Sequence, residues 1–473
     1  MLAVNKYLPV HLLALIAGGL ACLALAPFSW WPLALLSVLI FYGLLYNADT
    51  LKRSLSIGFA YGAGYFLFGI SWVYVSMVDH AATPVLLAAA FTLLFCLGLG
   101  LFYVLLAFLY HRYMRRLSVP LIIIAFASLW VLLDFIRAWL FTGFPWLYLG
   151  YSGLDNWLAG YGPVVGQHGI TFLIVLTSLC LFYALKQPRH VILPTLLWVG
   201  GLALQTIDWT EPSQQRQITL LQGNVDLATK WQLQQLNESL EYYFSRTYAH
   251  LDSDLIIWPE TAAATYWDNV QPAAEALSDL AASQNTVVIA GTVLRNEAQP
   301  DGDYYNGLVA FGAEQGAYAK QRLVPFGEYV PWETQLRGVM QLFDLPMSQF
   351  RLPSFEQGLL LSQTTPVAGN ICYEIAYAGL VAKQAKYAQL IVTVSNDSWF
   401  GDTMAPWQHL QMAQMRALEN GRPVARATNS GISALIDHRG RLVTQMPQFV
   451  EAQTTGNLQL RHGRTPFNYL VAR

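Results

Sequence analysis

The chain has 473 residues, of which 55% are hydrophobic and only 12% are charged, and its mean hydropathy is +0.36. A soluble globular domain carries about 25% charged residues, so these values exclude a wholly water-soluble protein. The formal net charge of −2 provides no basic field for nucleic acid. Lysine and arginine are unevenly spread, with nine in residues 1–207 and eighteen in residues 208–473. The sequence therefore predicts a membrane region followed by a water-soluble domain.

The first region contains seven apolar segments that are long enough to cross, or nearly cross, a bilayer. They are residues 8–26, 30–46, 54–78, 84–110, 119–141, 163–185 and 191–207. The first has the length of a signal peptide, but six further segments follow it, and APFSWWP is typical of an aromatic interfacial turn. We therefore predict a multi-pass α-helical membrane domain over residues 1–207.

Positive charge alternates between the predicted loops. Eight basic residues fall on one set of loops: Lys6, Lys52, Arg53, Arg112, Arg115, Arg116, Lys186 and Arg189. The alternate loops, near 27–29, 79–83 and 142–162, contain no lysine or arginine. The positive-inside rule then predicts a cytoplasmic N-terminus. Seven crossings would place residue 208 onward in the periplasm or outside the cell.

Two charged residues, Asp134 and Arg137, lie within the fifth apolar segment and share one helical face. We favour an ion pair that steadies the helical bundle. The alternative is a polar contact for a lipid headgroup.

From about residue 213, short β-branched and apolar runs alternate with helical stretches. The predicted strands are QITLLQGNV, DLIIWPE, TVVIAGTV, NGLVAFG, PVAGNICYE, LIVTVSND, PVARATNSG and SALIDHRG. The predicted helices are residues 231–251, 271–284 and 404–420. This pattern predicts an α/β layered domain over residues 208–460. Residues 461–473 contain two arginines before an apolar stretch, and we expect them to begin a further membrane helix that is cut short.

The four cysteines differ in their surroundings. Cys22, Cys96 and Cys180 lie in apolar helices, where cysteine packs as a small hydrophobe. Cys372 is the only thiol of the predicted exported domain, so it cannot form an intrachain disulfide there. A lone thiol in an oxidising compartment is expected to be buried or used.

A thiol nucleophile needs a base to take its proton and a positive group to stabilise the developing charge. Glu260 directly follows an apolar strand and stands behind Trp258 and Pro259, which suits a desolvated base. Lys320 offers a positive charge, and Glu328 follows it in YAKQRLVPFGEYVP. Each has an ordinary interpretation as well, since Glu260 could cap a helix and Lys320 could be a solvated surface lysine.

Glutamate, lysine and cysteine in that order, on separate strand ends, resemble the nitrilase (carbon-nitrogen hydrolase) superfamily. Together with seven preceding helices, QGNVDLATKW, IIWPETA, LVPFGEYVP, NICYE and NDSWFGD resemble the apolipoprotein N-acyltransferase family over nearly the whole chain. The resemblance implies an αββα sandwich in the extracytoplasmic domain and a place in the bacterial inner membrane, with the catalytic domain in the periplasm. The sequence departs from the family pattern at one place, because the final membrane helix that the family implies is expected to be cut short here.

The resemblance also implies roles for individual residues. Cys372 matches the nucleophile, Glu260 the general base and Lys320 the lysine that stabilises the oxyanion. The residues that match supporting or substrate-binding positions are Glu328, Tyr373, Glu374, Trp231 and Asn306. The implied reaction transfers an acyl chain from a phospholipid to the amino group of an S-diacylglyceryl-cysteine apolipoprotein, by way of a cysteine thioester. This is the last step of bacterial lipoprotein maturation.

The expected partners are a phospholipid acyl donor, a diacylglyceryl apolipoprotein acceptor and the lipid bilayer. No nucleic acid partner is expected, and we expect a monomer. No cofactor is implied, because no Gly-rich phosphate loop follows a strand. No metal is implied either, because no His/Cys cluster has ligand spacing.

Two segments could exclude water from a thioester. The loop 339–353 is unusually apolar, through Met340, Leu342, Phe343, Leu345, Met347 and Phe350, and could dip into the bilayer. Trp399, Phe400 and Trp407 could form a lid. Packing in the protein core is the alternative for both.

The sequence leaves two other functions as alternatives. A membrane-tethered nitrilase-type amidase would use water as the acceptor, but seven helices exceed what a tether needs. A transporter or receptor would need more intramembrane charges than Asp134 and Arg137 supply.

Overall fold

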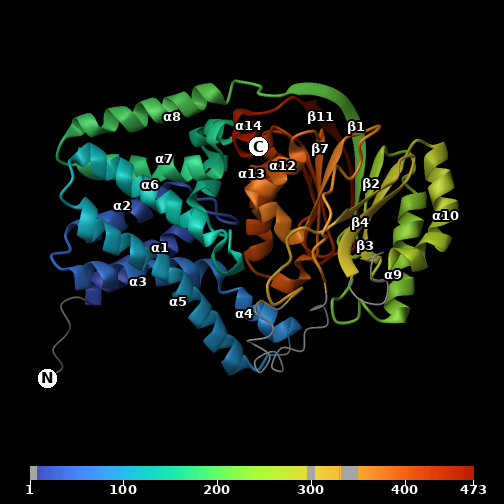
Figure 1. Ribbon diagram of the computed structural model, residues 1–473, viewed down its shortest axis with the longest axis horizontal. Helices are drawn as coiled ribbons and strands as arrows, with labels where there is room; N and C mark the ends of the chain where they lie inside the picture. Colours follow the sequence, from blue (N-terminus) through green and yellow to red (C-terminus); the bar gives the residue numbers. More distant parts are fainter. Residues whose placement is uncertain (1–7, 82, 296–303, 330, 332–349, 473) are drawn as a thin grey trace. The chain divides into compact units, whose positions relative to one another are not determined.

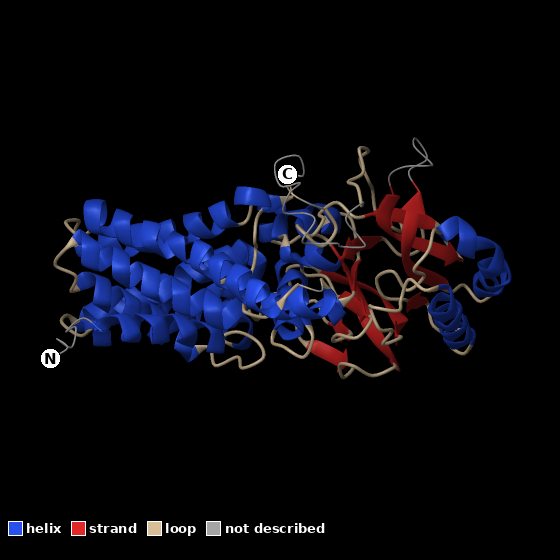
Figure 2. Ribbon diagram, turned by 90° about the horizontal axis from the view of Figure 1, so that it is seen from below, coloured by secondary structure: helices blue, strands red, loops and turns tan. Residues whose placement is uncertain are grey.

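The computed structural model describes residues 8–81, 83–295, 304–329, 331 and 350–472. The chain forms two compact units. Unit one comprises Met1–Val78, Thr83–Asp208 and Asp402–Gln411. Unit two comprises Asp79–Ala82, Trp209–Gly401 and Met412–Arg473. Figure 2 shows that unit one consists of helices and loops, whereas the strands belong to unit two.

Unit one is built from apolar helices (Figure 1). Its α-helices are α1 (Leu8–Leu23), α2 (Pro32–Tyr46), α3 (Leu51–Ile70), α4 (Val73–Val75), α5 (Val85–Leu109), α6 (Val119–Arg137), α7 (Gly162–Ala184) and α8 (Ile192–Leu204). The shorter π and 3-10 segments are η1 (Ser76–His80, which ends in unit two), η2 (Tyr110–Met114), η3 (Leu140–Thr142), η4 (Leu149–Asp155), η5 (Trp157–Tyr161) and η6 (Pro188–Val191). Each of the seven predicted apolar segments therefore contains a helix.

Not all of these helices have the length of a membrane span. Within the described residues, three do by length and composition: Val85–Met114, Val119–Arg137 and Trp157–Ala184. Three others are apolar but shorter: Pro9–Leu23, Pro32–Tyr46 and Pro188–Leu204. The predicted segment 54–78 falls on two helices that are apolar enough together to form one span, but the chain bends by 56° between Leu51–Ile70 and Val73–His80. The bend follows Gly69 and includes Ser71, and such residues are common at helix kinks.

Glycine lets three helices of unit one approach closely. A Cβ atom on Gly64 of α3 would lie 2.0 Å from the carbonyl oxygen of Leu15 in α1. A Cβ atom on Gly62 would lie 2.7 Å from the Cα of Gly100 in α5. Because helices in a bilayer associate mainly through such tight packing, this is the interface expected of a membrane bundle.

Unit two contains two mixed sheets. The first has the strand order β11-β1-β2-β3-β4-β5, and the second has the order β10-β9-β8-β7-β6. The strands are β1 (Glu211–Gln222), β2 (Leu255–Ile257), β3 (Val287–Arg295), β4 (Tyr304–Gly312), β5 (Gly316–Ala319), β6 (Val367–Ile371), β7 (Leu390–Ser395), β8 (Val424–Thr428), β9 (Ala434–Ile436), β10 (Leu442–Gln445) and β11 (Ala452–His462). The helices are α9 (Leu233–Tyr248), α10 (Trp267–Ser283), α12 (Ala378–Ala385), α13 (Ala405–Asn420, which begins in unit one) and α14 (Pro466–Val471).

The central strands β2, β3, β6, β7 and β8 are apolar on both faces because both faces are covered. Successive side chains of a strand point to opposite faces, so Ile257 and Ile289 join the core between the two sheets while Ile256 and Val288 face outward. The outward side chains pack against α9 and α10, and α12 packs on the second sheet (Figure 1). This layering confirms the predicted fold class, a helical domain plus an αββα sandwich.

Strand direction gathers the ends of several strands at one edge of each sheet. In the first sheet β2 and β3 are parallel, and β4 is antiparallel to both β3 and β5. The last residues of β2 and β5 and the first residues of β4 therefore share an edge. In the second sheet β6, β7 and β8 are parallel, so their carboxyl ends also share one edge.

The end of the chain belongs to the sandwich. Arg461 lies in β11, which pairs with β1 from Glu211 to Gln222, and its guanidinium donates to the backbone and side-chain oxygens of Thr210. Phe467 of α14 packs with Ala382 of α12. β11 therefore continues past the boundary predicted at residue 460. The domain limits and the further membrane helix stay predictions.

Candidate active site

The candidate nucleophile, Cys372, stands between β6 and the 3-10 turn η7 (Cys372–Ala376). Its φ of +51° lies in the left-handed region, which is uncommon for residues other than glycine. Such strain persists only where the surroundings hold it, and it is frequent at functional sites. The sharp turn leaves the thiol at the carboxyl edge of the second sheet, where it is 9% exposed.

Two carboxylates and one lysine meet at the edge of the first sheet. Lys320 follows β5, and its Nζ lies 2.8 Å from Glu328 Oε1 and 3.4 Å from Glu260 Oε1. Asn306, in β4, donates from Nδ2 to the same two oxygens, at 2.7 Å to Glu260 and 2.8 Å to Glu328. All four side chains are at most 7% exposed. The structure thus brings four of the predicted site residues into one hydrogen-bonded cluster.

The second oxygen of Glu260 is bound less heavily than the first. Its Oε2 accepts the backbone N–H of Asn396 at 2.8 Å, whereas Oε1 accepts from both Asn306 and Lys320. A carboxylate has about four acceptor positions. Among the described donors, Oε1 therefore has two partners and Oε2 has one.

The electrostatics give the lysine and the cysteine different protonation states. Burial works to lower the pKa of Lys320, but the charges of Glu328 and Glu260 outweigh it and raise that pKa above its ordinary value. Lys320 is therefore a cation at any physiological pH and cannot act as a base. Burial raises the pKa of the Cys372 thiol, Glu260 raises it further, and Lys320 opposes them. The resting thiol is therefore protonated, so its attack requires a base.

Glu374 ties the nucleophile turn to the lysine. Its carboxylate accepts the N–H of Ile371 before the turn, at 2.7 Å, and the N–H of Gln321 after Lys320, at 2.6 Å. Tyr318 donates its hydroxyl to the same carboxylate. Burial raises the pKa of Glu374 to about 7, although the N–H of Ile371 and of Gln321 oppose this. Glu374 therefore aligns two strand ends from different sheets.

The remaining predicted residues are Tyr373 and Trp231. Tyr373 is 8% exposed and packs its ring edge-on against Tyr377, with centroids 5.2 Å apart. Trp231 is 40% exposed in the turn before α9. The roles of Tyr373 and Trp231 in the site stay predictions.

Gly291 of β3 sets the position of the Glu260 turn. A Cβ atom there would lie 2.2 Å from Pro259 O and 2.8 Å from Glu260 Cα, and both are backbone atoms that cannot swing aside. Gly291→Ala should therefore displace Glu260 and lower turnover by about 100-fold, since a misplacement of about 1 Å can cost that much. The measurement is acyl transfer by the purified variant.

The matched control is Gly358→Ala, because nothing lies within 4 Å of a Cβ atom at Gly358. It should leave both turnover and thermal unfolding nearly unchanged. A Gly291→Ala protein with wild-type turnover would contradict the placement of Glu260 by this contact.

Sequence reasoning missed three residues that the structure adds to the site. Asn396 binds Glu260 through its backbone, and the Asn429 side chain donates to Asn396 Oδ1. Lys230 is buried, and its Nζ lies 2.9 Å from the backbone oxygen of Glu260. Asn396 and Lys230 stand in NDSWFGD and QGNVDLATKW, two motifs of the resemblance, but nothing in the sequence singles out these two positions.

Of the two predicted water-excluding segments, the loop 339–353 falls mostly outside the described residues. The residues of this loop that are not described include Met340, Leu342, Phe343, Leu345 and Met347. Phe350 is described and is 1% exposed, and it packs edge-on against Tyr304 with ring centroids 4.9 Å apart. Phe350 is therefore a core residue. Trp399, Phe400 and Trp407 are half-buried, and their role as a lid stays a prediction.

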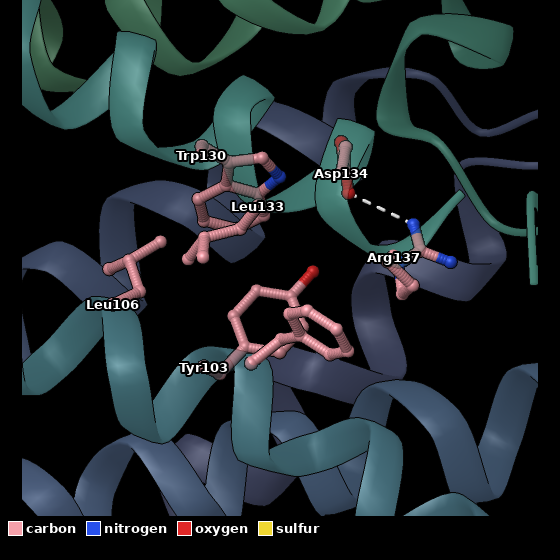
Figure 3. A pocket seen from close by; sticks show the side chains of 7 residues that line it. Tyr103, Leu106, Trp130, Leu133, Asp134 and Arg137 are labelled. Carbon is pink, nitrogen blue, oxygen red and sulfur yellow. Dashed lines mark hydrogen bonds and ion pairs between the residues drawn. The ribbon is translucent and has the colours of Figure 1, made fainter. Parts of the chain in front are cut away.

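Asp134 and Arg137 form a buried ion pair in unit one, with Arg137 Nη2 2.9 Å from Asp134 Oδ1 (Figure 3). Arg137 also donates to the carbonyl oxygens of Phe144 and Trp146. The adjoining cavity, which Tyr103 also lines, measures about 10 Å³. Through these contacts the pair steadies the loop after α6, as the ion-pair interpretation expects. A headgroup contact at this place stays a prediction.

Within the described part of the chain, no group of three or more histidine, cysteine, aspartate or glutamate side chains is arranged to hold a metal ion. The predicted absence of a metal stays a prediction.

Two family models match separate parts of the chain. Residues 17–181 match the family model of the apolipoprotein N-acyltransferase N-terminal domain, and residues 217–464 match that of carbon-nitrogen hydrolases. A carbon-nitrogen hydrolase from Helicobacter pylori G27 is 13% identical with a TM-score of 0.39, over 52% of this chain and 89% of that one.

Three curated relatives are similar over almost their full length. Proteins named apolipoprotein N-acyltransferase are 43% identical in Pseudomonas syringae pv. tomato, over 97% of this chain and 92% of the relative, and 41% identical in Azotobacter vinelandii, over 97% and 91%. The protein of that name from Vibrio parahaemolyticus is 35% identical over 96% and 92%. The chain therefore belongs to the apolipoprotein N-acyltransferase family.

Proposed function

We propose that this acyltransferase moves an acyl chain from a phospholipid to the N-terminal amino group of an S-diacylglyceryl-cysteine apolipoprotein, through a thioester on Cys372. Membership of the family supports the reaction. The single observation that carries the mechanism is the cluster in which Lys320 and Asn306 bind Glu260, beside a cysteine in a strained turn.

In the first half-reaction, Glu260 takes the proton of the Cys372 thiol, and the sulfur attacks the ester carbonyl of the phospholipid. The protonated thiol and the single described donor on Glu260 Oε2 support this assignment. Lys320, together with a backbone N–H near residue 373, balances the negative charge on the tetrahedral oxygen. As the C–O bond breaks, Glu260 returns its proton to the leaving lysophospholipid oxygen, which leaves a thioester.

In the second half-reaction, the amine of the apolipoprotein attacks the thioester carbonyl. Glu260 accepts a proton from the nitrogen, the C–S bond breaks, and the sulfur takes the proton back from Glu260. The product is an amide and the free thiol is restored, so the cycle is ping-pong. Glu328, Asn306 and Glu374 hold the reacting groups in place through the hydrogen bonds described above. We propose Tyr373 and Trp231 as supporting residues of the substrate pocket.

We further propose residues 1–207 as a membrane domain and 208–460 as a catalytic domain. The N-terminus would be cytoplasmic and the catalytic domain periplasmic, in a bacterial inner membrane. The alternation of loop charge supports this orientation. The enzyme would act as a monomer without a cofactor.

Product analysis tests the acceptor. Purified protein in detergent micelles would receive a phospholipid with a labelled acyl chain and a diacylglyceryl-cysteine peptide. We expect the label on the peptide as an amide that resists hydroxylamine. Label that appears only as free fatty acid would show that water is the acceptor, and the amidase interpretation would replace ours.

A further inference from the structure

Lys230 is a buried cation beside the candidate site. It lies in the turn between β1 and α9 and is 3% exposed. Its Nζ donates to the backbone carbonyl oxygen of Glu260, 2.9 Å away. Lysine is almost never fully buried unless it is paired. The contact with the Glu260 carbonyl therefore suggests that the buried ammonium has a function at this position.

The carbonyl that Lys230 binds belongs to a strained peptide. Glu260 is followed by Thr261, whose φ is +45°. A β-branched residue in the left-handed region is a true outlier. The peptide between these two residues sets the direction in which the Glu260 side chain leaves the end of β2. A donor that binds the oxygen of this peptide therefore influences the orientation of the Glu260 carboxylate without contacting the carboxylate.

The charge balance of the site is a second, independent reason to expect a role for the Lys230 ammonium. Glu260 and Glu328 share two donors, of which only Lys320 is charged. With both carboxylates ionised, these three residues keep one unbalanced negative charge in a buried place, which is costly. Lys230 supplies the missing positive charge.

We propose that Lys230 is a positioning residue for the base: its ammonium fixes the Glu260–Thr261 peptide and completes the charge balance of the carboxylate cluster. The inference rests on the proposed function of the site. Because Trp231 is the next residue, the same contact also fixes the turn that carries this predicted substrate-pocket side chain.

The pH dependence separates this role from a merely structural one. Burial lowers the pKa of Lys230 to about 8. Among the described residues, the charged group that acts on Lys230 is the Glu260 carboxylate, and it opposes the lowering of this pKa. Turnover should fall as pH rises through that value, because a neutral amine is a weaker donor and no longer balances the cluster.

Stability should move in the opposite direction over the same range. The native pKa lies below the ordinary value of 10.5, so the native protein binds fewer protons than the unfolded chain between these values. Loss of the Lys230 proton therefore adds to stability as pH rises. A residue that only held the fold together would leave the turnover of the folded enzyme level over this range.

The test compares the full-length wild-type protein with Lys230→Met, Lys230→Arg and the control Lys383→Met. Lys383 is exposed at the end of α12. Each protein would be assayed for acyl transfer from a labelled phospholipid to a diacylglyceryl-cysteine peptide, with kcat, KM and thermal unfolding followed as pH rises. We expect Lys230→Met to lower kcat by about 100-fold with little change in KM. Lys230→Arg should restore most of kcat and lose the alkaline decline, because arginine stays charged. The control should match the wild type.

Three results would overturn the proposal while leaving the proposed function intact. The first is a Lys230→Met protein with wild-type kcat, and the second is a Lys230→Arg protein with the same alkaline decline as the wild type. The third result applies if neither variant folds. It is a wild-type turnover that stays level as pH rises through about 8. A wild-type protein that transfers no acyl chain to the peptide would instead overturn the proposed function.

Discussion

Replacing Cys372 with alanine should lower turnover by about 10⁴- to 10⁶-fold, because a group of catalytic residues fails as a unit when its nucleophile is removed. Alanine removes the one atom that can carry the acyl chain. The side chain is small and 9% exposed, so the fold should survive the change. Initial rates with a labelled phospholipid and a diacylglyceryl-cysteine peptide would measure the loss.

Cys180→Ala is the matched control, because this cysteine is also buried but lies within α7. It should keep wild-type turnover. Cys372→Ser should remain far below the wild type, since a buried hydroxyl is a poorer nucleophile than a thiol next to the same base. A Cys372→Ala protein with even a tenth of wild-type turnover would contradict covalent catalysis at this residue.

Replacing Lys320 with methionine should damage both stability and turnover. Methionine leaves Glu260 and Glu328 buried without the cation between them, and breaking a buried pair in this way costs about 3–5 kcal/mol. Loss of the oxyanion partner should also lower kcat by about 10²- to 10³-fold. Denaturant unfolding followed by tryptophan fluorescence, together with the transfer assay, would measure both effects.

The pH dependence of this variant has a defined sign. The native pKa of Lys320 is raised above its ordinary value of 10.5, so its contribution to stability is fully present below that value and is lost only as pH rises through the native pKa. The wild-type contribution is therefore constant between about pH 5 and pH 9. Over this range, titration of Lys320 should therefore add no pH dependence to the stability difference between the wild type and Lys320→Met.

The double variant Lys320→Met/Glu328→Gln separates the two effects. It removes one of the unpaired carboxylates, so part of the lost stability should return. Turnover should not return, because the cation that faces the oxyanion is still absent. If the double variant regained wild-type turnover, Lys320 would be a structural residue only.

Much of the sandwich could be predicted from apolar runs, because strands with both faces buried are apolar throughout. β11 was missed for the opposite reason. Its residues from Ala452 to Asn457 are mostly half-buried or exposed, and it becomes a strand by pairing with β1. β5 is only four residues long and was missed as well. The bend after Ile70 was missed because the apolar pattern continues through it.

The candidate site could be predicted where a reactive side chain directly follows an apolar strand. Glu260 and Cys372 each come directly after an apolar run, and parallel strands bring such ends to one edge. What could not be predicted depends on pairing between distant segments. Lys230 stands in a polar turn, where a lysine is expected to be solvated, and only the packing of that turn against Glu260 buries it. The link from Glu374 to Gln321 is equally invisible in the sequence.

The most direct test of the mechanism is to look for the acyl-enzyme itself. Purified protein would be mixed with a phospholipid that carries a labelled acyl chain, without acceptor, and its peptides would be mapped by mass spectrometry. We predict one acyl adduct on Cys372 that is cleaved by hydroxylamine, is discharged by a diacylglyceryl-cysteine peptide, and is absent from Cys372→Ala. An active protein that carries no adduct, or carries it on another residue, would contradict the thioester mechanism.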